Sequence, residues 1–95
     1  MYTYEDILAL AKPHGVTGEG KHTIVETADY QVSIVGGRER LYGDFINDFE
    51  VAIIRKSDGE FVSGELFPEY SDDPNGVMPY LSKEQMLEVV NKMVG

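Results

Sequence analysis

The chain has 95 residues, no cysteine and a formal net charge of −9, with 17 acidic side chains against 8 lysines and arginines. This length fits one small domain, residues 1–95, and the missing thiols exclude disulfide bonds, thiolate metal sites and cysteine nucleophiles. The negative field repels nucleic acid and anionic membranes, so the expected partner is a basic protein surface. The absence of a basic leader and of a membrane-length apolar run predicts a cytoplasmic protein.

The first predicted element is a short helix that begins at Thr3. Its hydroxyl can accept a hydrogen bond from a backbone N–H one turn on, and Asp6 completes a capping box. Pro13 and Gly15 are expected to end this helix, because proline cannot continue it and glycine favours its C-terminus.

Strands are predicted next, where β-branched residues combine with alternating polarity. The predicted strands are residues 22–27, 29–35, 38–45 and 48–56. The alternation is clearest at 30–34 and 49–53, where every second residue is apolar. These strands should therefore bury one face and expose the other.

The Asp-Gly step at 58–59 predicts a hairpin in which residues 60–66 return as a strand. With a two-residue turn, Ala52 faces Glu65. That register places acidic side chains together on the face away from the core: Asp48, Glu50, Glu65 and, just past the strand and opposite Asp48, Glu69. Carboxylates two residues apart on a strand are separated by roughly 6.6 Å, the order of the phosphate spacing in nucleic acid.

The C-terminal part is predicted to be a loop followed by a helix. Residues 67–81 contain three prolines and an Asn-Gly step, which favour a loop. Ser82 begins the last helix, and Gln85 completes a second capping box. The predicted fold class is therefore α+β, an antiparallel β-meander of about four strands flanked by an N-terminal and a C-terminal helix.

One stretch resembles a nucleotide-binding P-loop. Gly15, Gly20 and Lys21 have the spacing of that motif, but His22 stands where it needs serine or threonine. A P-loop follows a strand and opens a helix, whereas here a helix precedes the glycines and a strand follows them. The stretch is therefore interpreted as a turn.

Other catalytic and metal-binding patterns are incomplete. His14 and His22 lack the short spacings of zinc sites, so both are expected to be structural or exposed. Residues 71–82 match part of a calcium loop but have serine at its first and last ligand positions. No serine lies in a nucleophile elbow. We therefore expect no enzyme activity, no metal and no cofactor.

The acidic residues are concentrated between Asp44 and Asp73. Nine acids in this segment are opposed only by Arg55 and Lys56, so it carries −7 of the net charge. Two interpretations stay open. Crowded like charges cost stability, which a binding function could explain, but a solvated face that keeps a sheet soluble would look the same.

In size, charge and layout, the chain is similar to small phage-encoded inhibitors, including anti-CRISPR proteins, with its acids along "DFINDFE" and "GELFPEYSDD". The resemblance covers the whole chain in layout and charge and rests on no specific motif. It implies a non-enzymatic inhibitor that mimics nucleic acid and occupies the basic channel of a phage-defence or host nuclease in a bacterial cell. The predicted partner-binding residues are Asp48, Glu50, Glu65, Glu69, Tyr70, Asp72 and Asp73.

The alternative is a small accessory or structural protein that forms a homo-oligomer, such as a homodimer, through its tyrosines and an apolar edge. Acidity would then serve only solubility. Salt separates the two hypotheses, because electrostatically steered binding weakens as salt rises and apolar association does not.

Overall fold

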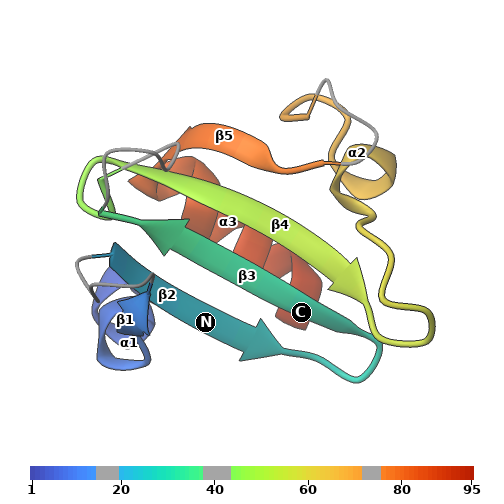
Figure 1. Ribbon diagram of the computed structural model, residues 1–95, viewed down its shortest axis with the longest axis horizontal. Helices are drawn as coiled ribbons and strands as arrows, with labels where there is room; N and C mark the ends of the chain where they lie inside the picture. Colours follow the sequence, from blue (N-terminus) through green and yellow to red (C-terminus); the bar gives the residue numbers. More distant parts are fainter. Residues whose placement is uncertain (15–19, 38–43, 72–75) are drawn as a thin grey trace.

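The computed structural model describes residues 1–14, 20–37, 44–71 and 76–95, and it contains one five-stranded antiparallel sheet in the order β1-β2-β3-β4-β5 (Figure 1). The elements are α1 (Tyr4–Ala9), β1 (Lys12–His14), β2 (Gly20–Glu26), β3 (Tyr30–Gly36), β4 (Asp48–Arg55), α2 (Ser63–Leu66), β5 (Met78–Ser82) and α3 (Lys83–Val94). The predicted α+β meander between two terminal helices is confirmed, with five strands rather than about four.

Both terminal helices begin as predicted. The Thr3 hydroxyl accepts from the N–H of Asp6, and the Asp6 carboxylate accepts from the N–H of Thr3. Ser82 and Gln85 form the same reciprocal pair at the start of α3. Local capping chemistry therefore fixes where each helix starts.

The core lies between the sheet and the two terminal helices. Figure 1 shows α3 crossing behind β3 and β4, and α3 packs against β3, β4 and β5. Alternate strand residues reach the core as predicted, because Val32, Ile34 and Val51 are fully buried. On the side of α1, the buried Thr23 hydroxyl donates to the Ile7 carbonyl at 2.8 Å and ties that helix to β2.

Two strands contain proline, and the sequence did not predict them. Pro13 lies in β1 opposite Lys21, and Pro79 lies in β5. These are the two outermost strands of the sheet, where a missing N–H need not break a ladder. The predicted loop at 67–81 is thus wrong for residues 78–81, which belong to β5 and include Tyr80 at a positive φ of 56°.

The predicted hairpin at 58–59 is wrong in register and extent. The Arg55 N–H donates to the Glu60 carbonyl, and Phe61 makes an isolated bridge to Ile54, so residues 60–66 form no returning strand. The Ser63 hydroxyl instead accepts from the Ile53 N–H at 2.8 Å. The Ser63 hydroxyl thus takes the place of the backbone carbonyl that a returning strand would offer to Ile53, and the chain leaves the sheet and forms α2.

The predicted strand at 38–45 falls mostly outside the described residues. Its last two residues, Asp44 and Phe45, belong to a turn. One Asp44 carboxylate oxygen accepts from the N–H groups of Ile46, Asn47 and Asp48 at 2.8, 2.7 and 3.2 Å. The turn holds Phe45 at a positive φ of 63° with its side chain buried.

Candidate protein-binding surface

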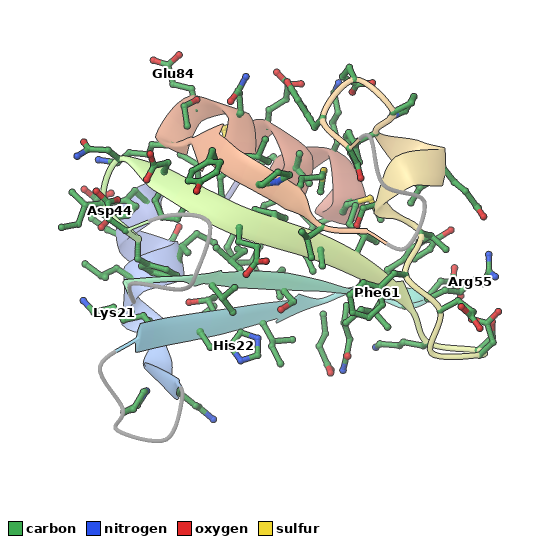
Figure 2. The ribbon with its side chains drawn as sticks, turned by 45° about the horizontal axis from the view of Figure 1, so that its top comes forward. Lys21, His22, Asp44, Arg55, Phe61 and Glu84 are labelled. Atoms are coloured by element: carbon green, nitrogen blue, oxygen red, sulfur yellow. The ribbon has the colours of Figure 1, made fainter. Side chains whose placement is uncertain are left out.

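Among the described residues, the helices α1 and α3 cover one face of the sheet and leave the other uncovered. Figure 2 shows His22 and Phe61 on the side of the sheet away from α3. Because directly paired residues of antiparallel strands share a face, the register defines this surface, here called the open face. It consists of Lys12, His22, Ile24, Glu26, Gln31, Ser33, Val35, Glu50, Ala52, Ile54 and Phe61.

The open face is arranged in rows that cross the strands. One row is Lys12, His22, Val35 and Glu50; the next is Ile24, Ser33 and Ala52; the third is Glu26, Gln31, Ile54 and Phe61. Charged groups thus lie at three of the four ends of the outer rows, at Lys12, Glu50 and Glu26, and Phe61 lies at the fourth. The apolar members of the open face are Ile24, Val35, Ala52, Ile54 and Phe61. They cross the rows from β2 to the segment after β4, and this set is here called the apolar centre.

The open face exposes more apolar side chains than the water-facing side of an antiparallel sheet usually does. Outward positions of an antiparallel sheet with one face in water are usually polar. Here Ile24 is 44% and Phe61 41% exposed, and Val35 and Ile54 are half-buried beside them. Exposed apolar side chains among polar ones are typical of protein-binding surfaces.

Acidic groups lie on two sides of this apolar centre. The side chain of Glu26 is 59% exposed, accepts from the Gln31 amide at 2.9 Å and lies 3.8 Å from the Lys56 ammonium. Glu50 is half-buried in the row that starts at Lys12. These carboxylates can pair with lysine or arginine of a partner.

His22 and Ser33 form a polar contact on the open face, with 2.9 Å between Nε2 and Oγ. A base beside a hydroxyl is one requirement of nucleophilic catalysis. Catalysis also needs donors aimed at an oxyanion, but Ser33 lies in the central strand β3, whose N–H groups serve the ladders to β2 and β4. The geometry therefore favours a cross-strand contact over a catalytic pair.

The predicted acidic array is divided between two places. Asp48 and Glu50 lie at the start of β4. Glu65 lies on α2, where its carboxylate is 3.9 Å from the Arg55 guanidinium, and Glu69 is exposed in the turn after that helix. The two ends of β4 are roughly 23 Å apart, so the prediction that Glu65 faces Ala52 and Glu69 faces Asp48 is wrong.

Tyr70, the aromatic residue among the predicted partner-binding residues, is half-buried and contacts other residues of its own chain. Its ring stacks on Phe67 with centroids 6.4 Å apart, and its hydroxyl donates to Glu88 of α3 at 3.1 Å. Desolvation, together with that carboxylate, raises the pKa of Tyr70. The aromatic side chain on the open face is instead Phe61.

Other predicted features fall partly outside the described residues. Asp72 and Asp73 lie there, within residues 72–75 of the calcium-like stretch, and so do residues 15–19 of the P-loop-like stretch. Gly20 and Lys21 begin a strand, not a helix. Across residues 1–14, 20–37, 44–71 and 76–95, no three histidine, aspartate or glutamate side chains form a metal-ion cluster. No helix in those ranges has the length and apolarity to cross a bilayer.

Sequence reasoning missed the apolar residues of the open face, although a signal was present. Residues 51–54 are apolar without interruption, so both faces of β4 carry hydrophobic side chains, including the outward Ile54. Ile24 likewise lies outward between two inward residues of β2. Apolar residues at outward strand positions would have pointed to this face.

Comparison of the chain with protein-family models, with curated proteins and with solved structures found no match.

Proposed function

We propose that this chain is a non-enzymatic binding protein whose open face docks on a basic protein surface. The observation that carries the proposal is the apolar centre, which has Ile24 and Phe61 exposed at its two ends and Glu26 and Glu50 beside it. Apolar area supplies affinity when it is removed from water, and the acids favour a partner of opposite charge.

The net charge supports a basic partner over a neutral one. At −9, the molecule attracts cationic surfaces over a Debye length, about 8 Å at physiological ionic strength. Surfaces that bind nucleic acid are strongly basic, so the partner we propose is a nucleic-acid-binding channel, such as that of a nuclease. Binding to this chain should then compete with nucleic acid.

The experiment compares two matched double variants as bait for capture from bacterial lysate at low salt. Phe61→Lys with Glu26→Lys changes one exposed apolar residue and one acid on the open face. Leu8→Lys with Glu5→Lys makes the same change in charge on α1, where Leu8 is 37% exposed.

We expect the wild-type chain to retain a basic protein, and duplex DNA to displace it. The open-face variant should bind that protein at least about tenfold more weakly, because the loss of a hot-spot residue costs about 2 kcal/mol or more. The α1 variant should lose much less. If both variants lost the same amount of binding affinity, long-range charge attraction alone would explain the binding, and the proposed surface would be wrong.

A homo-oligomer is the second candidate, because the same apolar centre could also bury itself against another copy. The net charge of −9 on each copy opposes that association. Sedimentation equilibrium distinguishes the candidates. A dimer that strengthens with salt and is lost in Phe61→Lys favours the oligomer, whereas a monomer favours the basic partner.

A further inference from the structure

The strand β2 is longer than the strand that covers its outer edge. Its residues run from Gly20 to Glu26, but β1 pairs only with Gly20–His22. Figure 1 shows β1 beside the N-terminal part of β2 alone. Within the described ranges, the outer edge of β2 beyond His22 therefore has no strand beside it.

Hydrogen-bond alternation shows which backbone groups face this edge. The Thr27 N–H donates to the Tyr30 carbonyl at 2.8 Å and closes the turn between β2 and β3. Hydrogen-bonded and non-hydrogen-bonded pairs alternate along an antiparallel ladder. Because Thr27 bonds to β3, Val25 also bonds to β3, whereas the N–H and C=O groups of Ile24 and Glu26 point away from β3.

The nearest chain segment does not satisfy these outward groups. Leu10 donates its N–H to the Asp6 carbonyl at 3.3 Å, and Ala11 donates to Leu8 at 3.1 Å. Leu10 is the C-cap of α1 and Ala11 follows it, and neither residue belongs to a ladder. The edge at Ile24–Glu26 is thus a short template for another strand.

A pocket lies at the same edge, where β1 meets the open face. Its volume is about 320 Å³, at the small end of ligand pockets. It is lined by Leu10, Lys12, Pro13, His22 and Ile24. Leu10 and Ile24 are 47% and 44% exposed, so an apolar side chain placed here would cover them.

We infer that the basic partner supplies an extended segment that pairs antiparallel with β2 at Ile24–Glu26. This inference rests on the proposed function and adds its binding mode. The segment residue opposite Ile24 places an apolar side chain at the pocket. The residue opposite Glu26, two positions away and about 6.6 Å along the strand, is lysine or arginine. Backbone pairing gives affinity, and the alternate side chains give specificity.

The probe is a short acetylated peptide with a central valine, lysine two residues to either side and threonine elsewhere. Two N-methylated forms test the backbone pairing. In an antiparallel ladder, residues opposite Ile24 and Glu26 exchange both hydrogen bonds. Methylation of the valine and lysine N–H groups therefore blocks pairing, whereas methylation of the threonine N–H groups leaves it intact.

The readout is amide hydrogen exchange followed by NMR. We expect the unmodified and threonine-methylated peptides to slow exchange at Ile24 and Glu26 by about tenfold or more, and the valine- and lysine-methylated peptide to have no effect. In the protein, Ile24→Pro should abolish binding, since proline is tolerated on an edge but donates no hydrogen bond. Ile24→Val should keep it.

Equal binding by both methylated peptides, or protection elsewhere than at Ile24 and Glu26, overturns the inference. Protection that rises with protein concentration alone also overturns it, because a second copy is then the occupant. If no peptide binds but the captured basic protein still depends on Phe61 and Glu26, the edge inference fails and the proposed function stands. If no peptide binds and capture of the basic protein does not depend on Phe61 and Glu26, the edge inference and the proposed function both fail.

Discussion

Asp44 is an exposed carboxylate whose role is to order a turn. Its oxygen accepts from three backbone N–H groups, those of Ile46, Asn47 and Asp48. These bonds, with that of Asn47 the largest contribution, lower the pKa of Asp44 to about 2 from 3.8. The turn holds the buried ring of Phe45 against Phe49, with ring centroids 5.3 Å apart.

The lowered pKa of Asp44 predicts a specific pH dependence of stability. The ionised form is favoured by folding, so its contribution is fully present above about pH 4 and is lost as the pH falls toward about 2. Asp44→Asn keeps an acceptor but removes this titration. Urea unfolding from about pH 5 to about pH 2 should show the stability of the two proteins converging. A difference that stays constant over this range contradicts the assignment.

At the scale of elements, Ser63 determines the path of the chain after β4. Its side chain is fully buried, and its hydroxyl takes the Ile53 N–H that a returning strand would have bonded. This contact, together with the Val62 N–H to the Ile53 carbonyl, anchors α2 to the sheet.

Ser63→Ala should therefore destabilise the protein by about 1–3 kcal/mol, because it leaves a buried backbone N–H without an acceptor. Urea unfolding measures the change in the free energy of unfolding. Ser57→Ala, in the exposed turn after β4, is the control and should change it by about 0.5 kcal/mol or less. If the two variants are equally stable, Ser63 is not the anchor of α2.

Elements with local signals were predictable, and those fixed by distant contacts were not. Thr3 and Ser82 carry their capping partners three residues away, so both helix starts could be derived from the sequence. The strands β1 and β5 form only through contacts with residues distant in the sequence. Their position at the two edges of the sheet explains why Pro13 and Pro79 are tolerated there.

The candidate site was less predictable than the fold, for the same reason. Which acids share a face depends on the strand register. The hydroxyl of Ser63 accepts from the Ile53 N–H, so the chain leaves the sheet there and Glu65 lies on α2 instead of on a returning strand. The total charge was readable from composition, but its placement was not. The apolar open face could be recognised only from the structure, in which the described helices α1 and α3 cover the other face of the sheet.

The described residues of the molecule form two layers, a sheet and the helices α1 and α3, which leave one face of that sheet uncovered. Folding buries the inner side of the sheet against α1 and α3, and the acids keep the molecule strongly negative. Long-range charge then brings a basic partner close, and the apolar centre of the open face holds it, as proposed above. Raised salt should therefore slow association more than it speeds dissociation.

The most direct test is methyl NMR of the complex with the captured basic protein, in the presence of a soluble paramagnetic agent. Ile24 on the open face, Leu8 on α1 and Val94 on α3 are 44%, 37% and 39% exposed in the free chain, so all three methyl groups should be broadened. In the complex, Ile24 should be shielded from the agent while Leu8 and Val94 stay broadened. Shielding of Leu8 or Val94 with Ile24 still broadened would contradict the proposed binding surface.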